Sequence, residues 1–364
     1  MKRLIPLLLV LCMMLCACGK KPAADPTTVP TTTAVTTEAT TEVTAEATTE
    51  SPVIYRNPFN GALVDEAWKG RSAAVVINNI SDALPHYGTS QAEILYEVET
   101  ESGITRMLAI LDDPTELETL GPVRSTRTFF NNIAQAYDAP IFHCGGSVRG
   151  RNGYSDISSG KISDWDHVDQ MYNGKYFFRD ENRYYNQGYN YEHTLFATGE
   201  KLAQAMQDKE FATPTDRSCD FGLTFAEEVA LTGDAAATVT VTFRGGKTST
   251  FTYDAEAKLY RMAQYGSDYI DAGNEEHVSF RNVIVLFSEQ RFSHDGEYSR
   301  SYYELVGTGE GKLAIDGKIV PITWSRETLE SPFAYALEDG TAVTLGTGHT
   351  YVAVSGATEP VTAE

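Results

Sequence analysis

The stretch STRTFFNNIAQAY (residues 125–137), followed by DAPIFHCGGS (138–147), decides the fold class. Phe129 and Ile133 fall at helical spacing, and Ser125 is the predicted N-cap of that helix. The second stretch predicts a short strand that stops at the Gly-Gly pair. A helix that leads directly into a buried strand is typical of an α/β domain.

The residues before this helix predict further strands. AAVVINNI (73–80) is a short apolar, β-branched run and predicts a buried strand. AEILYEVETESGITRMLAILDD (92–113) predicts two strands joined by a turn at Ser102 and Gly103. Strands and a helix in this order indicate a mixed α/β N-terminal domain, placed at residues 53–232.

The rest of the chain is mostly short strands separated by Gly or Asp turns, which predicts a mainly-β C-terminal domain at residues 233–358. Hairpin turns are expected at residues 254–257 and at Asp316-Gly317. The predicted strands are AAATVTVTF (235–243), TSTFTYD (248–254), KLYRM (258–262), NVIVLF (282–287), SYYELVG (301–307), KLAIDGKIVPITW (312–324), TAVTLGTG (341–348) and TYVAVS (350–355). Residues 359–364 are expected to be a flexible tail.

The N-terminus, MKRLIPLLLVLCMMLCACGKK, has a charged start and an apolar run too short for a membrane-spanning helix. It is typical of a signal peptide, placed at residues 1–18. The tetrad LCAC resembles the bacterial lipobox, which predicts a lipid on Cys18; the alternative is an ordinary signal peptide cleaved nearby. A lipid there would anchor the chain to the outer face of the cytoplasmic membrane.

Residues 19–52 are rich in Thr, Ala, Glu and Pro and contain no aromatic residue. Such a segment cannot bury enough apolar surface to fold, so it predicts a disordered stalk. A stalk of this length can carry the folded part several nanometres from a membrane, about the scale of a cell wall.

Composition excludes several classes of function. The net charge of −21 argues against nucleic acid, whose binding needs Lys and Arg on phosphates, and against docking on anionic lipid through the protein surface. After lipidation only Cys144 and Cys219 remain, which makes no disulfide framework, although a single bridge stays open. Metal-binding histidine or cysteine motifs, a P-loop and a dinucleotide fingerprint are not found, so no metal or cofactor is expected.

Long motifs in both segments resemble the YerB-like lipoproteins, which are two-domain surface proteins of Gram-positive bacteria with unknown function. The resemblance implies the fold and the location but no activity. In place of a Pro-His-Asn-Leu-like motif, this chain has Glu192 and Thr194 around His193. The motifs are NPFNGALVDEAWKGRSAAVVINNI (57–80), LGPVRSTR (120–127), FHCGGS (142–147), FTYDAEAKLYRM (251–262) and DGTAVTLGTGHTYVAV (339–354).

Arg124 and Arg127 stand near the start of the predicted helix, where the helix dipole disfavours cations. Two arginines and free backbone N–H groups there could clamp a phosphate or a carboxylate. The alternative is an internal ion-pair network with carboxylates of the preceding hairpin. The candidate carboxylates are Glu97, Glu99 and Glu101.

The run His143-Cys144-Gly145-Gly146-Ser147 is a second candidate, because ligand loops of α/β proteins follow the carboxyl ends of strands. His143 is a possible acid or base, and Ser147 a cap or a nucleophile. Neighbours on a strand point to opposite faces, so His143 and Cys144 are not expected to pair.

A third candidate is YFFRDENRYYNQGYNYEHTLF (176–196), which is dense in Tyr and Asn. Its tyrosines and amides could bind a sugar, with charge from Arg179, Arg183 and His193; alternatively, the loop packs its rings on the domain.

Three hypotheses follow. The first is a membrane-anchored binding protein for an anionic envelope ligand, such as a cell-wall polymer, or for an envelope protein, in a cleft lined by Arg106, Arg124, Arg127, His143 and the Gly-Gly-Ser loop. The second is an enzyme acting on envelope glycan or phosphate polymers, with His143 or a β-hairpin carboxylate as acid or base. The third is an interaction scaffold without a small ligand.

Overall fold

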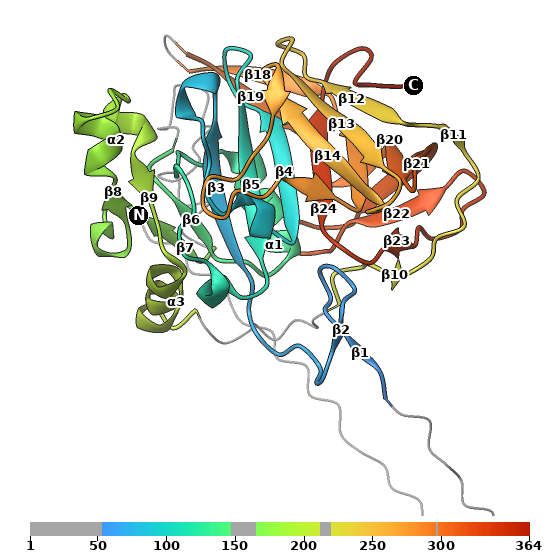
Figure 1. Cartoon of the computed structure of the whole chain (residues 1–364), viewed down its shortest axis with the longest axis horizontal. Coiled ribbons are helices and arrows are strands. Elements are labelled where there is room, and N and C mark those ends of the chain that lie inside the picture. Colours follow the sequence, from blue (N-terminus) through green and yellow to red (C-terminus); the bar gives the residue numbers. More distant parts are fainter. Residues whose placement is uncertain (1–52, 147–164, 212–219, 296–297) are drawn as a thin grey trace, which may run out of the picture. The chain divides into compact units, whose positions relative to one another are not determined.

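Strands from both segments of the chain pair in one sheet of eleven strands (Figure 1). The computed structural model describes residues 53–146, 165–211, 220–295 and 298–364. The path through the sheet is β11-β21-β20-β17-β24-β4-β5-β3-β6-β7, and β22 pairs with β21. The bounds are β3 Ala73–Asn79, β4 Ile94–Glu99, β5 Thr105–Leu111, β6 Ile141–His143, β7 His167–Asp169, β11 Asp234–Ala235, β17 Asn282–Phe287, β20 Gly307–Ile315, β21 Lys318–Arg326, β22 Ala334–Leu337 and β24 Thr350–Ser355.

The strand β24, near the end of the chain, joins the two segments of this sheet. It pairs parallel to β4, with Val352 opposite Tyr96, and parallel to β17, with Val352 opposite Ile284. All six residues of β24 are buried, as expected for a strand covered on both faces. Residues 53–364 therefore cluster as one compact unit.

A second, six-stranded sheet is built only from the later segment, in the order β15-β14-β13-β12-β25 with β16 on β14. Its β13–β14 hairpin turns at 255–258, one residue later than predicted, and the β20–β21 hairpin turns at Asp316-Gly317, as predicted. Residues 361–363 of the expected tail pair with the edge of β12. The bounds are β12 Thr238–Thr242, β13 Thr248–Asp254, β14 Leu259–Gln264, β15 Ser267–Asp268, β16 Ser279–Phe280 and β25 Val361–Ala363.

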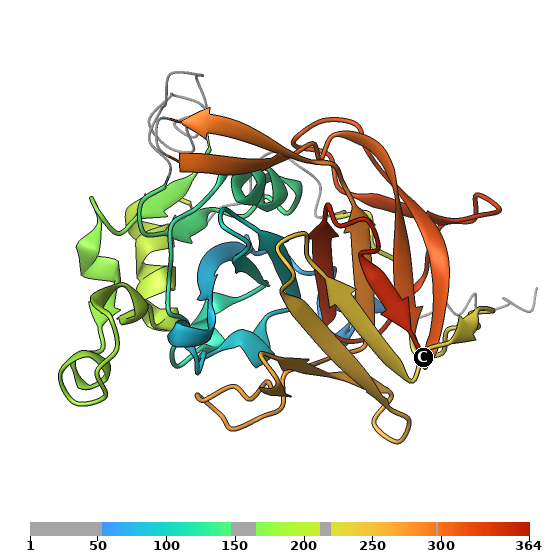
Figure 2. The ribbon, with the colours of Figure 1, turned by 90° about the horizontal axis from the view of Figure 1, so that it is seen from above.

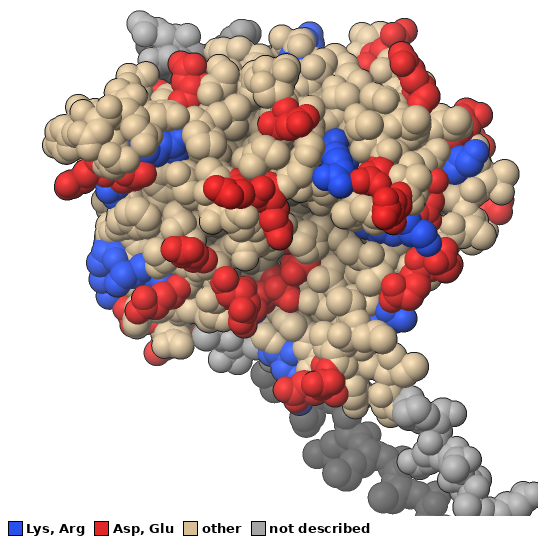
Figure 3. Space-filling model, in the orientation of Figure 1, with Lys and Arg blue, Asp and Glu red and all other residues tan. Residues whose placement is uncertain are grey.

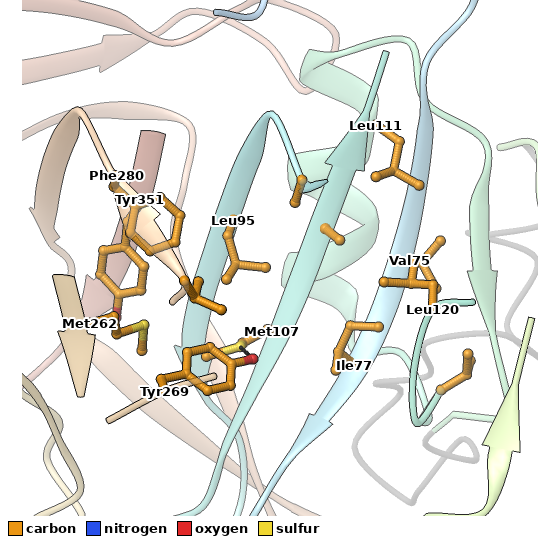
Figure 4. Packing of buried hydrophobic residues seen from close by; sticks show 14 of the residues in the cluster. Val75, Ile77, Leu95, Met107, Leu111, Leu120, Met262, Tyr269, Phe280 and Tyr351 are labelled. Carbon is orange, nitrogen blue, oxygen red and sulfur yellow. Dashed lines mark hydrogen bonds between the residues drawn. The ribbon is translucent and has the colours of Figure 1, made fainter. Parts of the chain in front are cut away.

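Side chains alternate between the two faces of the central sheet and form two apolar cores. On one face, Val75, Leu95 and Met107 pack with Tyr351 and Met262 from the later segment (Figure 4). On the other face, Val76 and Leu108 belong to the core that includes the aromatic side chains of the first helix. Mixed α/β structure is thus followed along the chain by mainly β structure, which confirms the predicted fold class.

The first helix packs on one face of the central sheet. The segment from β7 to α3 lies on the side away from the β12–β14 hairpins (Figures 1 and 2). The helices are α1 Thr128–Ala136, α2 Glu181–Tyr185 and α3 Gly199–Asp208, with single 3-10 turns η1 Ser81–Ala83, η2 Thr89–Gln91, η3 Pro114–Glu116, η4 Gly174–Tyr176 and η5 Tyr191–His193. Four two-strand pairs complete the description: β1 Tyr55–Arg56 with β2 Leu63–Val64, β8 Phe178–Arg179 with β9 Leu195–Phe196, β10 Phe225–Ala226 with β23 Leu345–Gly346, and β18 Gln290–Asp295 with β19 Tyr298–Tyr303.

The prediction of Ser125 as the N-cap was wrong. Helix α1 begins at Thr128, and Arg127 is its N-cap. Residues 124–126 are instead held by backbone hydrogen bonds from Arg124 N–H to the Val76 carbonyl and from Thr126 N–H to the Gly145 carbonyl. Pairing with the neighbouring strands therefore outweighs the local capping preference of a serine.

Candidate functional site

The loop before α1 crosses the carboxyl half of β3 and the end of β6, where ligands commonly bind in parallel sheets. The carbonyl of Arg124 accepts a hydrogen bond from the Cys144 N–H at 3.0 Å, and the carbonyl of Gly145 accepts one from Thr126 at 3.1 Å. Gly145 has a φ of +71°, which favours glycine, and its N–H donates to the Asp169 carboxylate at 2.8 Å. Arg124 and the Gly145 turn are therefore brought side by side.

Arg106, Arg127 and Arg300 converge on the carboxylate of Glu101. Arg127 makes a two-point contact with both carboxylate oxygens, and Arg300 Nη1 donates at 2.9 Å. Arg106 Nη2 lies 3.6 Å from Glu101, while its Nη1 donates to the Ser125 carbonyl at 2.7 Å. Arg106 and Arg127 are buried, so they hold the loop and the helix start in place.

Glu101 is strongly held in its charged form. Burial acts to raise the pKa of its carboxyl, but the hydrogen bond and charge of Arg127, together with the charges of Arg106 and Arg300, outweigh burial and lower the pKa to about 2. The carboxylate also neutralises a cation at the N-terminus of α1, where the helix dipole would otherwise disfavour it. An internal network therefore accounts for two of the predicted arginines.

The imidazole of His143 is fully buried at the end of β6. Its Nδ1 lies 2.9 Å from the Gly145 carbonyl, which can only accept, so Nδ1 carries the proton. Its Nε2 then accepts from His167 Nδ1 at 3.1 Å. Burial lowers the pKa of His167, which favours this neutral pair. This geometry makes His143 a support for the Gly145 turn.

Arg124 and Arg179 are two partly exposed arginines whose charges act on the thiol of Cys144. Burial raises the pKa of the Cys144 thiol, while the charges of Arg179 and Arg124 act in the opposite direction. Arg124 donates to Glu192 at 2.5 Å, and both side chains are partly exposed, at 27% and 47%. Arg179 donates to the Tyr191 carbonyl at 2.7 Å. Within the described ranges, no carboxylate lies within ion-pair distance of Arg179.

The buried ring of His193 lies beside the Glu192 carboxylate. The His193 ring is buried, and its Nδ1 accepts from the side-chain amide of Asn78 at 2.9 Å. The opposite ring nitrogen lies 3.6 Å from the Glu192 carboxylate. Burial lowers the pKa of His193, although the charge of Glu192 opposes this shift. Glu192 thus lies within ion-pair distance of both His193 and Arg124.

The other two carboxylates of the β4–β5 hairpin, Glu97 and Glu99, are bound by residues of the β12–β13 hairpin. These two segments were not connected in the sequence analysis. Glu97 is fully buried and accepts from Lys247 and, at 2.7–2.9 Å, from the side chains of Asn79, Ser249 and Tyr351. Burial acts to raise the pKa of Glu97, but Lys247 outweighs burial and lowers it. Glu97 and Glu99 stand at alternate positions of the apolar strand β4. A buried carboxylate needs a cation or hydrogen-bond donors, so this pattern could have predicted a partner from elsewhere in the chain.

Gly245 and Gly103 approach each other closely, and this contact brings Lys247 near Glu97. Gly245, at the tip of the β12–β13 hairpin, donates its N–H to Glu99 at 2.6 Å. A Cβ on Gly245 would lie 2.2 Å from the Cα of Gly103, so only glycine fits there. The hairpin tip and the β4–β5 turn therefore touch backbone to backbone.

The remaining predicted features divide as follows. Arg183 is buried and donates to the carbonyls of Ala83 and Pro85, which places it in a packing role. Gly146 lies beside Gly145 and is half-buried, whereas Ser147, Cys18 and Cys219 lie outside the described residues. In the described part of the chain, no group of three or more acidic, His or Cys side chains is arranged to hold a metal ion. No helix of that part is long and apolar enough to span a membrane.

Comparison with known proteins gives a consistent family match. Residues 59–212 match a family model described as "Protein of unknown function (DUF3048) N-terminal domain", and residues 239–352 match its C-terminal domain. "Putative lipoprotein YerB" of Bacillus subtilis (strain 168) is 26% identical over 260 residues, which cover 70% of this chain and 73% of that protein. The crystal structure of YerB protein from Bacillus subtilis shares the fold, with a TM-score of 0.68 at 22% identity, covering 85% of this chain and 99% of that chain.

Proposed function

Because the chain belongs to the DUF3048 family of proteins of unknown function, as its YerB-like motifs predicted, we propose its function from its own chemistry: it is a lipid-anchored extracytoplasmic protein that binds an anionic ligand. The LCAC tetrad ending at Cys18 supports the anchor, and a relative carries the name "Putative lipoprotein YerB". The Thr-rich residues 19–52 would carry the folded part away from the outer face of the cytoplasmic membrane.

The observation that carries the binding proposal is the pair Arg124 and Arg179 beside the Gly145 turn. Each charge-assisted hydrogen bond to an anion contributes about 1.5–3 kcal/mol. The Arg124–Glu192 pair that a ligand would displace is partly exposed, and such pairs contribute only about 0–1 kcal/mol. An incoming phosphate or carboxylate would therefore replace Glu192 at little cost.

Because the whole protein is acidic, an anion is attracted only close to the two arginines. Asp and Glu side chains are spread over the face drawn in Figure 3, with fewer Lys and Arg among them. An anion is repelled by the net charge of −21 until it reaches the two guanidinium groups. Added salt screens both effects, so affinity is expected to depend on ionic strength.

The test uses residues 18–364 with Cys18→Ser, so that the chain is soluble. Its melting temperature is measured with inorganic phosphate and with anionic polymers solubilised from bacterial cell wall. We expect at least one of the two, inorganic phosphate or the anionic polymers, to raise the melting temperature, because a ligand that binds only the folded state stabilises it. Arg124→Ala and Arg179→Ala should remove this rise.

Arg291→Ala is the matched control, because Arg291 is an exposed arginine on β18 that pairs with the exposed Glu289. It should respond to the ligands as the wild type does. An unchanged melting temperature in the wild type, or an equal rise in all the variants, would contradict the proposal.

A further inference from the structure

We propose that the anionic ligand is a glycan whose sugar rings stack on an aromatic platform, defined as Tyr184, Tyr185 and Tyr191, while its acidic groups meet Arg124 and Arg179. This inference rests on the proposed function, which supplies anion binding by Arg124 and Arg179, and it adds that the ligand is a glycan. The evidence is the exposure of the three rings, their mutual contacts and their continuity with the arginines.

The platform is the exposed part of a longer aromatic segment. Tyr184, Tyr185 and Tyr191 are 41%, 74% and 58% exposed. The ring centroids of Tyr184 and Tyr185 lie 4.9 Å apart, and those of Tyr184 and Tyr191 lie 5.6 Å apart. Contiguous exposed apolar surface is uncommon on soluble proteins and marks interaction or ligand-binding sites.

The platform joins directly to the proposed anion site. The guanidinium of Arg179 lies 4.1 Å from the ring centroid of Tyr191 and donates to the carbonyl of the same residue. The next residue, Glu192, is the partner of Arg124. In Figure 3 the surface over α2 is largely free of charged side chains, and charged groups lie just below it. A ligand can therefore contact rings and arginines at once.

A sugar matches this mixture of groups. One face of a pyranose ring presents C–H bonds, which pack on the negative face of an aromatic ring, while the hydroxyls at its edge need hydrogen-bond partners. Exposed amide side chains supply such partners around α2. They are Asn182, Asn186, Gln187 and Asn190.

The chain that carries the platform is anchored to the domain by buried contacts. Arg183, between Asn182 and Tyr184 in α2, is fully buried, and its guanidinium packs 4.2 Å from the ring of Tyr189. Tyr189 in turn donates to the carbonyl of Leu84 at 2.8 Å. Asp180 caps α2 by accepting from the Arg183 N–H at 3.0 Å. Rings on a fixed support lose little conformational freedom when a ligand binds, which favours affinity.

The experiment measures binding of wall glycan strands by titration calorimetry with residues 18–364 carrying Cys18→Ser. The first probe is soluble glycan strands that an N-acetylmuramoyl-L-alanine amidase releases from cell wall and that are then freed of phosphate polymers. These strands carry the lactyl carboxylates that the amidase leaves. The second probe is the same strands after carbodiimide amidation of those carboxylates. We expect Tyr184→Ala and Tyr185→Ala each to raise Kd for the native strands about tenfold, the loss of roughly one ring contact.

Tyr55→Ala is the control, since Tyr55 is an exposed tyrosine on β1, outside the platform. It should bind as the wild type does. Melting temperatures of all variants within about 2 °C of the wild type would show that folding is intact, as expected for exposed rings.

The outcomes separate this inference from the proposed function. If Arg124→Ala loses binding but the tyrosine variants bind as the wild type does, the anion site stands and the glycan platform is overturned. If amidated strands bind as well as native strands while the tyrosine variants fail, the platform stands and the anionic function is overturned. If the wild type does not bind the strands, the glycan proposal is overturned, even if phosphate raises the melting temperature.

Discussion

The ammonium of Lys247 pairs with the carboxylate of Glu97 although 150 residues separate them, and neither side chain is more than 6% exposed. This pair fastens the tip of the β12–β13 hairpin onto β4, and so joins the six-stranded sheet to the central one. Ser249 and Tyr351, from the same later segment, also donate to Glu97. The early segment therefore supplies a buried charge that only the later segment satisfies.

Lys247→Met should be strongly destabilising. The substitution leaves the Glu97 carboxylate buried without its cation, which typically costs about 3–5 kcal/mol. Adding Glu97→Gln should restore part of the free energy of unfolding, because the buried charge is then gone. Urea unfolding of both single variants and the double variant measures this coupling. Purely additive losses would show that the two side chains do not interact.

Glu101 makes the protein sensitive to acid. Its pKa is about 2 in the folded state against 4.5 as the ordinary value, so its contribution to stability is present above pH 4.5 and is lost as the pH falls towards 2. The contribution is on the order of 3 kcal/mol. Glu101→Gln should reduce the free energy of unfolding at pH 7 by about this much and flatten its decline between pH 4.5 and 3. An unchanged acid limb in the variant would contradict the network with Arg127.

Glu93, just before β4, should act in the opposite direction. Burial and then the charge of Asp112 raise the pKa of the Glu93 carboxyl to about 7, although the hydrogen bond from Asn60 at 2.6 Å opposes them. A raised pKa means that its contribution to stability is complete below pH 4.5 and is lost as the pH rises to about 7. The free energy of unfolding should therefore fall over this range, by on the order of 3 kcal/mol from this group.

Glu93→Gln should remove that loss, because the amide cannot ionise and still accepts from Asn60. Urea unfolding between pH 5 and 8 compares it with Glu116→Gln, a variant at an exposed glutamate. Parallel pH profiles for the wild type and Glu93→Gln would exclude Glu93 as the titrating group.

Phe59 ties the first described residues to the second core. Its ring is fully buried, with its centroid 4.6 Å from that of Phe221 and 5.1 Å from that of Trp68. Phe59→Ala should lower the free energy of unfolding by about 3–5 kcal/mol, since a large cavity remains. Leu63→Ala, at a 65% exposed side chain, is the control and should change little. Equal effects of the two substitutions in urea unfolding would refute this anchoring role.

Prediction from the sequence succeeded where the local pattern settles the structure. The run at 73–80 became β3, and the turn at Ser102-Gly103 separates β4 from β5, because apolar runs and a glycine turn carry that information within a few residues. It failed at Ser125, where backbone pairing with β3 and the Gly145 turn moved the start of α1 to Thr128. The candidate arginines were found, but Arg300 as a partner of Glu101 was not, since 199 residues separate them.

The sequence by itself determined the order of α/β and mainly-β segments, the lipobox-like tetrad, and the residue types of the proposed anion site and of the aromatic loop. Only the tertiary structure decided that β24 enters the sheet between β4 and β17, and that Arg106 and Arg127 are buried while Arg124 and Arg179 stay partly exposed. Local hydrophobic patterns depend on neighbours a few residues away, and these the sequence displays directly. Which buried charge meets which partner depends on the packing of distant segments, and the desolvation of unpaired charges selects that arrangement.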